Sequence, residues 1–482
     1  METQLLIAGA RTPAENGRSY DRLNPVTGKL ATRAAAGSVA DAKAAVAAAE
    51  AAFPAWSATG PAERRAILNR AADIVEARAG EFVAAMERET GSTGIWAGFN
   101  VHLASGVLRE AAAMTTQIGG EVIPANKPGT LAMAVHRPRG VCLGIAPWNA
   151  PVILGMRAVA MPLACGNTVV LKASEMCPAT HMLIGECLTE AGLPEGAVNV
   201  VTNDPKDAAE VVKALIEAPA VRHVNFTGST GVGRIIGRLA GENLKPSLLE
   251  LGGKAPLVVL EDADLDGAVN AAIFGAFMNQ GQICMSTERI IVVEAVADAF
   301  VEKFAARAAT LPWGDPAAGD VVLGALVSAD AGAKMSALLS DATAKGAKLV
   351  AGGEGAGALH SATLLDGVTP AMRIYAEESF GPVKSIIRVK DTEEAVQVAN
   401  DTEYGLSAAV FSQDITRALS VANRLQSGIC HINGPTVADE PQMPFGGVKD
   451  SGYGRFGGKA AIYEFTDLRW ITLEDPAQHY PF

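Results

Sequence analysis

The sequence has 482 residues, which exceeds the capacity of one ordinary hydrophobic core and predicts a protein of two or three domains. Apolar residues make up 49% of the chain and charged residues 19%, a balance that excludes an intrinsically disordered protein. The formal net charge is −12 and no long basic run is present, so we expect no nucleic-acid partner.

The chain is expected to be cytoplasmic and to make no membrane contact. Its first residues, METQLLIAGARTPAENG, lack the basic region and the long apolar run of a secretion signal. The apolar stretch 140–171 is broken by three prolines and by Arg157, which favours a buried strand, loop, helix and strand over a membrane span.

The six cysteines indicate neither disulfides nor a metal site. None forms a CxxC pair or lies at zinc-ligand spacing from a histidine, so we expect reduced thiols and no bound metal. They are Cys142, Cys165, Cys177, Cys187, Cys284 and Cys430.

In chain order, residues 1–35 have the pattern of short strands with turns, and residues 40–90 that of helices. From about residue 140, short apolar runs alternate with helical segments, and a second such series begins after residue 250. This alternation is typical of parallel sheets covered by helices, so we predict the α/β fold class.

Two segments fit neither series. Residues 121–139 and the C-terminal tail contain TLAMAVHRPRG and LRWITLE, which alternate like edge strands. Because neither has an obvious sheet within the chain, we predict that they pair with another subunit.

The stretch VNFTGSTGVGRIIG, residues 224–237, predicts a strand, a glycine-rich turn and a helix. Backbone amides at such a helix start bind phosphate, and Gly228, Gly231 and Gly233 allow a close approach. Ser229 adds a hydroxyl donor. The spacing is not GxGxxG, so a plain strand–helix turn is an equal alternative on this motif alone.

In VVLKASE, Lys172 and Glu175 follow a buried strand at its carboxyl end, where open α/β sheets bind ligands. A carboxylate there can accept both hydroxyls of an adenosine ribose and would repel a 2′-phosphate. Read alone, the two side chains are more often part of a solvated loop.

Two polar residues in apolar surroundings carry further hypotheses. Glu250, in LLELGGKAP, would have a raised pKa and could act as a general base, with pairing to Lys254 as the even alternative. Asn149 lies between two prolines in APWNAP, where a rigid carboxamide can donate to an oxyanion. An asparagine that satisfies its own turn is the more common case.

Cys284 lies in NQGQICMSTER, a polar segment between two apolar runs. A free cysteine is only a few per cent thiolate at neutral pH and becomes a nucleophile when its pKa falls or a base takes its proton. No histidine lies nearby in the sequence, so Glu250 is the better candidate base. For Cys284 alone, buried filler is the commoner fate.

Together and in this order, PWNAP, ACGNTVVLKASE, FTGSTGVG, LELGGKAP, NQGQICMSTER, EESFGPV and PFGGVKDSGYGR resemble the aldehyde dehydrogenase superfamily over nearly the whole chain. Glu250 and Cys284 stand 34 residues apart, as the base and nucleophile of that family typically do. The resemblance implies Cys284 as the nucleophile, Glu250 as the general base and Asn149, with the Cys284 amide, as the oxyanion donor. The substrate would be a small aldehyde.

The resemblance also implies a nicotinamide cofactor. NAD is expected, and NADP is less favoured because of Glu175. The residues implied to contact the cofactor are Pro147, Trp148, Lys172, Glu175, Gly228, Ser229, Gly233, Leu251, Glu378 and Phe380.

The fold of that family has three parts. The resemblance implies a Rossmann-type NAD-binding domain at 1–120 and 140–250 and an α/β catalytic domain at 251–450. Residues 121–139 and 451–482 would form a β oligomerisation arm, giving a homodimer or a homotetramer.

The stretches GQICMSTERI and HINGPTVADEPQMPFGG further resemble the aromatic-aldehyde branch, which includes salicylaldehyde, vanillin and benzaldehyde dehydrogenases. The positions implied to face the aldehyde are Trp96, Phe99, Leu154, Arg157, Ile283, Met285 and Phe445. Arg157 would attract a ring hydroxyl or carboxylate, or pair with a local acid. One departure is Phe456, where many members carry a glutamate, which puts a proton relay through that position in doubt.

Rival functions stay open on the sequence. They are oxidation of an aliphatic aldehyde or semialdehyde, transfer of the acyl group to CoA, a non-catalytic structural use of the fold, and thiol hydrolysis without a cofactor. Glu250 argues against the CoA-acylating members, which generally lack this glutamate.

Overall fold

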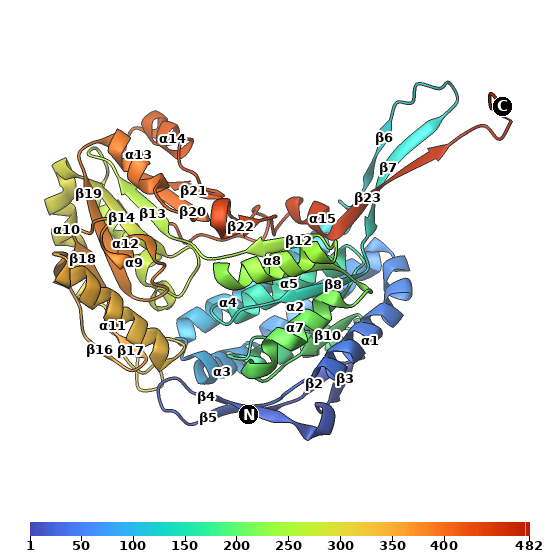
Figure 1. Ribbon diagram of the computed structural model, residues 1–482, viewed down its shortest axis with the longest axis horizontal. Coiled ribbons are helices and arrows are strands. Elements are labelled where there is room, and N and C mark those ends of the chain that lie inside the picture. Colours follow the sequence, from blue (N-terminus) through green and yellow to red (C-terminus); the bar gives the residue numbers. More distant parts are fainter. Residues whose placement is uncertain (478) are drawn as a thin grey trace.

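The computed structural model describes residues 1–477 and 479–482. The chain forms two α/β units, each built on a mainly parallel sheet, and a three-stranded arm that extends away from them (Figure 1). The sheet of the first unit ends with β12 (Ser247–Glu250), and the sheet of the second begins with β13 (Ala255–Val259), so the junction lies between residues 250 and 255.

The first sheet has eight strands in the order β22-β12-β11-β8-β9-β10-β2-β3. Its parallel centre consists of β12, β11 (Val221–Thr227), β8 (Val141–Ile145), β9 (Thr168–Lys172) and β10 (Val198–Val201). The antiparallel edges are β22 (Gly452–Tyr453), β2 (Leu5–Ile7) and β3 (Ala10–Thr12). Predicted strands thus form where the sequence has continuous apolar runs, because both faces of a parallel sheet are buried.

Helices cover both faces of this sheet, and neighbouring residues of one strand belong to opposite cores. Val169 and Leu171 pack with α2 (Pro61–Ala77), α4 (Gly94–Met114), α5 (Pro151–Ala164) and α6 (Pro178–Glu190), whereas Val170 packs with α1 (Val39–Ala58), α7 (Ala208–Glu217) and α8 (Thr230–Glu242). The other elements of this part are α3 (Ala79–Thr90), β1 (Glu2–Thr3), β4 (Ser19–Leu23), β5 (Leu30–Ala35), η1 (Glu15–Gly17) and η2 (Pro205–Asp207).

The second sheet has seven strands in the order β15-β18-β19-β14-β13-β20-β21, and only β15 is antiparallel. Its further strands are β14 (Thr287–Val293), β15 (Lys348–Ala351), β18 (Thr363–Asp366), β19 (Val383–Val389), β20 (Ser407–Phe411) and β21 (Ile429–Ile432). The helices α9 (Leu265–Phe277) and α10 (Glu294–Ala308) contribute to one core. The other core takes residues from α11 (Ala329–Ala344), α12 (Arg373–Ala376), α13 (Thr392–Asn400) and α14 (Ile415–Ala422).

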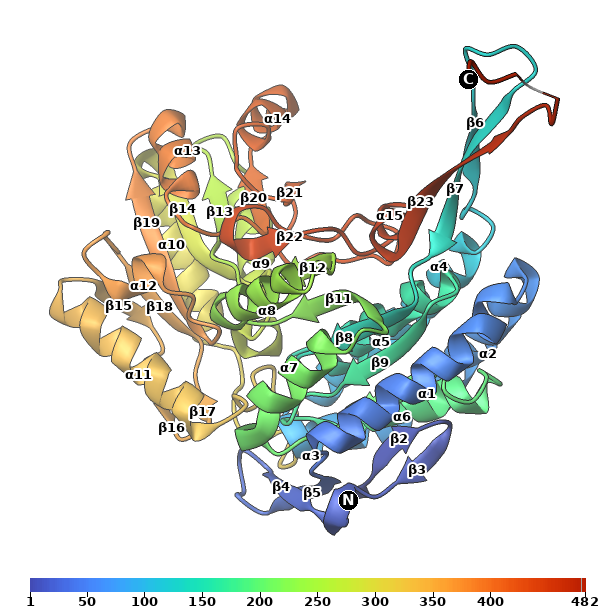
Figure 2. The ribbon, with the colours of Figure 1, turned by 45° about the vertical axis from the view of Figure 1, so that its right-hand side comes forward.

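The two alternating segments form a sheet of their own within the chain. β7 (Leu131–Pro138) lies antiparallel to β23 (Thr466–Leu473), with β6 (Gly120–Ile123) on its other side (Figure 2). Pairing of this arm with another subunit stays a prediction. The paired residues Leu468 and His136 are 332 positions apart in the sequence, and alternation alone cannot identify so distant a partner.

The predicted start of the arm at residue 451 differs from the structure. Gly452 and Tyr453 pair with β12 at the edge of the first sheet, and the helix α15 (Ala460–Phe465) leads from there to β23. The remaining short elements are β16 (Gly355–Ala356), β17 (Leu359–His360), η3 (Met278–Gly281) and η4 (Lys449–Ser451).

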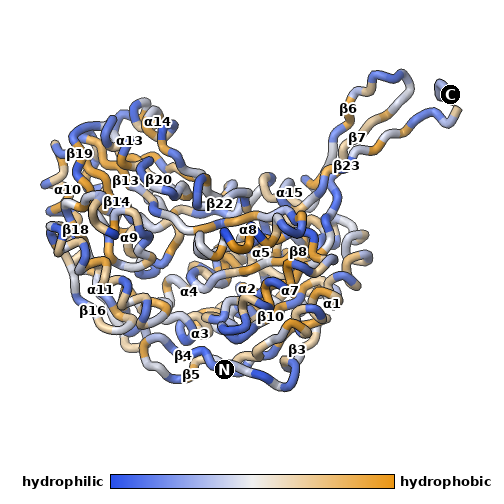
Figure 3. Tube along the Cα trace, viewed as in Figure 1, coloured by the Kyte–Doolittle hydropathy of each residue, from blue (hydrophilic) through white to orange (hydrophobic). Residues whose placement is uncertain are grey.

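The apolar stretch 140–171 forms β8, α5 and β9, as the prolines predict. Among the residues that the structure describes, no helix combines the length and the apolar character needed to cross a bilayer. Apolar residues concentrate in the packed interiors of the two units, and some also alternate with hydrophilic ones along the arm (Figure 3).

Candidate active site

Cys284 lies in a loop between η3 and β14, and this loop has an unusual backbone. Asn279 and Gln280 have φ values of 49° and 55°, and Gly281 follows at 73°. A side chain on Gly281 would place its Cβ 2.4 Å from the Gly381 carbonyl oxygen, so only glycine fits. Three successive left-handed residues persist only where surrounding contacts determine the conformation.

Buried hydrogen bonds supply those contacts. The Gln280 side chain donates to the Ala325 carbonyl oxygen at 2.9 Å, and Gln282 accepts from the Val327 amide at 3.0 Å. On the other side of the cysteine, the Thr436 hydroxyl donates to the Met285 carbonyl oxygen at 2.7 Å. The loop that carries Cys284 is therefore fixed on both sides by residues distant in sequence.

Asn149 is fixed against the same loop. Its carbonyl oxygen accepts from Trp96 Nε1 at 2.9 Å and from Asn279 Nδ2 at 3.0 Å, while its own Nδ2 donates to the Gln282 carbonyl oxygen at 3.0 Å. The alternative of a turn satisfied by its own asparagine is thus wrong, because this side-chain bond is nonlocal. The carboxamide has a second N–H with no bond among the described residues, and Asn149 lines the same pocket as Cys284.

Glu250 is the last residue of β12 and is clamped by its neighbours. Its carbonyl oxygen accepts from the Gly228 amide at 3.0 Å, and it pairs with Gly452 in the strand register. Its carboxylate is 1% exposed, and neither carboxylate oxygen has a hydrogen-bond partner. Lys254 pairs with Glu288 instead, so the alternative in which Lys254 neutralises Glu250 is wrong.

Burial raises the pKa of Glu250 to about 8, a shift that the adjacent Cys284 thiol and the charge of Arg157 oppose. The pKa of Cys284 is also raised well above its ordinary value, first by burial and then by the negative charge of Glu250. Ionisation of one group therefore makes ionisation of the other less favourable. The carboxylate of Glu250 can accept the thiol proton when the sulfur reacts.

An apolar pocket of about 560 Å³, mouth included, opens onto Asn149 and Cys284, and Glu250 does not line it. All seven residues predicted to face the aldehyde line this pocket: Trp96, Phe99, Leu154, Arg157, Ile283, Met285 and Phe445. Its walls also contain residues that the sequence did not indicate, namely Leu103, Ile153, Phe274, Met278, Val437, Ala438 and Asp439. No periodicity or motif separates these residues from ordinary core or loop positions.

Arg157 pairs with a local acid, which was one of its two predicted roles. Its Nη2 lies 2.9 and 2.8 Å from the two carboxylate oxygens of Asp439, and both side chains are buried. The guanidinium also lies 4.5 Å from the ring centre of Phe445 and 5.9 Å from that of Phe456. Phe456 is 2% exposed, so an aromatic ring fills the position where many relatives were expected to have a glutamate.

The predicted cofactor residues gather at the carboxyl ends of the first sheet. Lys172 ends β9, is 5% exposed and pairs with Glu175, which also accepts from Asn203 Nδ2 at 3.1 Å. The solvated-loop alternative is therefore wrong for this pair. The charge of Lys172 and hydrogen bonds to Glu175 outweigh burial and lower the pKa of this carboxyl group, which keeps it ionised at neutral pH.

The start of α8 is open to a ligand. Ser229 occupies the N-cap position, is exposed, and its hydroxyl makes no capping bond. A Cβ on Gly233 would lie 2.3 Å from a methyl carbon of Leu251, so this glycine is needed for the helix to pack on the residue after Glu250. Free backbone amides at such a helix start are suited to an anionic group.

Two residues of the last predicted group, Glu378 and Phe380, come from the second unit, between α12 and β19. Glu378 accepts from the Gly253 amide at 2.8 Å, and burial raises its pKa to about 7. Phe380 and Trp148 meet edge to face with ring centres 5.6 Å apart, and Pro147 is half-buried in the same loop as Trp148. All six cysteines are free thiols.

The chain belongs to the aldehyde dehydrogenase family, whose model matches residues 12–471. It is an aldehyde-oxidising oxidoreductase, and the family uses NAD or NADP. The α/β fold class and the family resemblance predicted from the motifs are thereby confirmed.

Among its relatives, a vanillin dehydrogenase of Pseudomonas fluorescens is 62% identical over 481 residues, covering 100% of both chains. A salicylaldehyde dehydrogenase of Pseudomonas putida is 50% identical over 483 residues, again covering 100% of both. The crystal structure of a salicylaldehyde dehydrogenase from Pseudomonas putida G7 complexed with salicylaldehyde has a TM-score of 0.98 and 49% identity, and the match covers 100% of each chain.

We predict that Gly253→Ala displaces the loop that carries Cys284. The new Cβ would lie 2.3 Å from the Cys284 carbonyl oxygen. Because backbone cannot yield as a flexible side chain does, we expect a loss of about 1–3 kcal/mol in the free energy of unfolding. Aldehyde oxidation should fall by roughly 100-fold, since small displacements of reacting groups have effects of that size.

The matched control is Gly80→Ala on the exposed surface of α3, where nothing lies within 4 Å of the new Cβ. This variant should keep the parental rate and gain about 0.5–1 kcal/mol in stability. Equal thermal unfolding curves and equal rates for Gly253→Ala and the parent would show that Gly253 does not limit the position of Cys284.

Proposed function

We propose that this enzyme oxidises an aromatic aldehyde to the carboxylic acid, with NAD as the hydride acceptor and a thioester on Cys284 as the intermediate. The observation that carries the proposal is the meeting of Cys284, Asn149 and Glu250 beside an apolar pocket with aromatic walls. The vanillin and salicylaldehyde dehydrogenases among its relatives support the aromatic substrate class.

The reaction begins at the neutral thiol of Cys284. Glu250 accepts the thiol proton as the sulfur attacks the carbonyl carbon, so a carbon–sulfur bond forms and the carbonyl oxygen becomes anionic. The free N–H of Asn149 and the Cys284 amide donate to this oxyanion. Loss of one such donor typically costs about 3–4 kcal/mol of transition-state stabilisation.

The residues present fit a nicotinamide cofactor. When bound, it would accept a hydride from the thiohemiacetal, and this loss of hydride would leave a thioester. The open start of α8 would hold the pyrophosphate, and Lys172 with Glu175 would hold the adenosine ribose. Glu378 and Phe380 would lie along the nicotinamide ribose and ring. The ionised Glu175 would repel a 2′-phosphate, so NAD is proposed over NADP.

After the thioester has formed, Glu250 releases the thiol proton to solvent, and as a carboxylate again it acts as general base for water. It removes a proton as the water oxygen adds to the thioester carbonyl, and the thiolate of Cys284 leaves as the acid forms. A pKa near 8 keeps a fraction of Glu250 ionised at neutral pH while making it a stronger base than an ordinary carboxylate.

Two substitutions separate the proposed steps. Cys284→Ala should lower NAD-dependent aldehyde oxidation by roughly 10⁴-fold or more, because the nucleophile is lost. Glu250→Gln should give a slowed burst of reduced cofactor, because removal of the thiol proton loses its base, followed by still slower turnover, because deacylation needs the same base. Stopped-flow absorbance of the reduced nicotinamide measures both.

Cys430→Ala, at another half-buried free thiol, is the control and should keep the parental rate. Parental turnover in either active-site variant would refute its assigned role.

The substrate and cofactor classes are tested by a panel of kcat/KM values. Vanillin, salicylaldehyde and benzaldehyde should each exceed acetaldehyde and propionaldehyde by about 100-fold or more, because a short chain leaves the aromatic pocket unfilled. With vanillin, NAD should exceed NADP by at least about tenfold, because Glu175 opposes the added phosphate. Aliphatic aldehydes equal to the aromatic ones, or NADP equal to NAD, would contradict the respective part of the proposal.

We further propose that the arm mediates assembly into a homodimer or homotetramer. Val122, Leu468 and Trp470 are 71%, 63% and 74% exposed on β6 and β23, the two edge strands of the arm. Apolar side chains on an open sheet edge are typical of strands that a partner covers.

The double variant Leu468→Glu/Trp470→Glu should therefore release monomers. Light scattering after size exclusion would measure a mass of at least twice the 49.7 kDa chain for the parent and about one chain for the variant. Leu244→Glu, at an exposed leucine outside the arm, is the control and should keep the parental mass. A double variant with the parental mass would exclude the arm as the assembly surface.

A further inference from the structure

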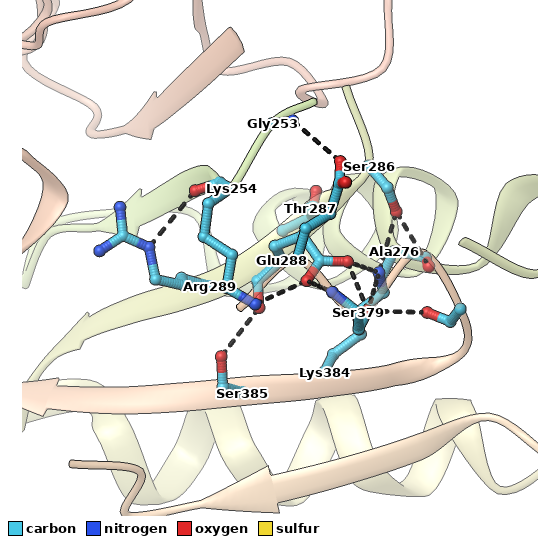
Figure 4. Close-up of polar contacts among 12 residues, drawn as sticks. Gly253, Lys254, Ala276, Ser286, Thr287, Glu288, Arg289, Ser379, Lys384 and Ser385 are labelled. Atoms are coloured by element: carbon cyan, nitrogen blue, oxygen red, sulfur yellow. Dashed lines mark hydrogen bonds and ion pairs between the residues drawn. The ribbon is translucent and has the colours of Figure 1, made fainter. Parts of the chain in front are cut away.

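A buried cluster of charges is formed by Glu288, Lys254 and Lys384 (Figure 4). Glu288, on β14, sits between Lys254 and Lys384, with each ammonium 2.7 Å from a different carboxylate oxygen. Both lysines are fully buried, and Glu288 is 2% exposed. The cluster thus contains one carboxylate and two ammonium groups.

Glu288 makes two more bonds, both to Ser379. Its Oε2 accepts from the Ser379 amide at 2.9 Å, and its Oε1 accepts from the Ser379 hydroxyl at 2.5 Å. Every bond of this carboxylate is thus made to a buried donor. Ser379 stands between Glu378 and Phe380, the two residues proposed to lie along the nicotinamide.

The segment Glu377–Phe380 has further anchors of the same kind. Lys254 also donates to the Glu377 carbonyl oxygen at 2.7 Å, and the neighbouring Gly253 amide donates to Glu378. Phe380 has a φ of +52°, a left-handed conformation that a bulky residue adopts only when its surroundings impose it. The contacts of the cluster, made to the residues just before Phe380, supply that constraint.

The same cluster also contacts the loop that carries Cys284. Lys384 donates to the Ser286 hydroxyl at 3.1 Å, and the Ser286 amide donates to the Ile283 carbonyl oxygen at 2.8 Å, closing a turn around Cys284. A single carboxylate is therefore bonded directly to the segment that contains Glu378 and Phe380, and through one lysine to the loop that carries Cys284.

Stability alone does not account for this arrangement. Well-packed apolar residues in place of buried ion pairs are often equally stable or more so, because the charges must be removed from water. A hydrogen-bonded charge cluster instead fixes the groups that it joins in one relative position. Two segments that contribute to one active site must be held in such a fixed position.

We propose that Glu288 is a positioning residue that holds the Glu377–Phe380 segment at a fixed position relative to the loop of Cys284. The role rests on the proposed function, because it requires that Glu378 and Phe380 position the cofactor and that Cys284 carries the substrate. The anchors of the loop at Gln280, Gln282 and Thr436 do not involve Glu288. Loss of Glu288 should thus displace the cofactor-contacting segment more than the thiol.

The test compares two reactions of one active site in Glu288→Gln. One is NAD-dependent oxidation of vanillin, and the other is acylation of Cys284 by p-nitrophenyl acetate without cofactor. Both rates are expressed per titratable Cys284 thiol, so loss of folded enzyme does not enter. Oxidation should fall by about 100-fold with a raised KM for NAD, while thiol acylation stays within about threefold of the parent.

Two further variants make the outcome independent of the fold of Glu288→Gln. Ser379→Ala removes one hydrogen bond without leaving a charge unpaired, and should lower the oxidation-to-acylation ratio by about threefold to tenfold. Asp366→Asn removes a buried carboxylate that pairs with Arg388 on the same sheet, and should lower the melting temperature without changing that ratio.

A parental oxidation-to-acylation ratio in Ser379→Ala and in folded Glu288→Gln would overturn the positioning role, and so would an equal fall of both rates. Failure of the proposed function has a different signature. In that case the parent would show no NAD-dependent oxidation of vanillin, or Cys284→Ala would retain it.

Discussion

The structure depends on how one short loop is held between two sheets. The three left-handed residues Asn279, Gln280 and Gly281 turn the chain so that Cys284 faces the pocket beside Glu250 and Asn149. Such a backbone is unfavourable by itself and is stabilised by buried hydrogen bonds that the loop donates to Ala325 and accepts from Val327 and Thr436. Those partners come from connections of the second unit, whereas Asn149 and Glu250 end strands or begin loops of the first. The reactive constellation therefore exists only when both units are folded and packed together.

Two buried glutamates show how the chain uses charge in opposite ways. Glu288 has every oxygen bonded to a buried donor, which holds its pKa far below the ordinary value and leaves it unable to take a proton. Glu250 has no hydrogen-bond partner, and burial raises its pKa to about 8. The first is suited to hold a position and the second to exchange protons. Glu250 ends β12 at the junction of the two units, and Cys284 follows η3, 34 positions later in the sequence.

Much of the fold could be predicted because its signals are local. Strands β8, β9, β10 and β11 follow from continuous apolar runs, and Pro61 after Gly60 begins α2 as its fixed φ favours. The motifs also indicated Cys284, Glu250, Asn149 and the seven predicted walls of the pocket. What could not be predicted depends on distant contacts: the pairing of β7 with β23, the ion pair of Arg157 with Asp439, and the cluster around Glu288. In each case the partners are far apart in sequence, and a single chain carries no signal that links them.

If the acyl group passes through Cys284, the acyl-enzyme can be trapped on that residue. The enzyme is mixed with NAD and vanillin, quenched in acid within milliseconds, digested and examined by mass spectrometry. We expect an acyl adduct, with the mass of vanillic acid less water, on the peptide that contains Cys284 and on no other cysteine peptide. Product formation without an adduct at Cys284 under conditions that trap other thioesters, or an adduct on a different cysteine, would contradict it.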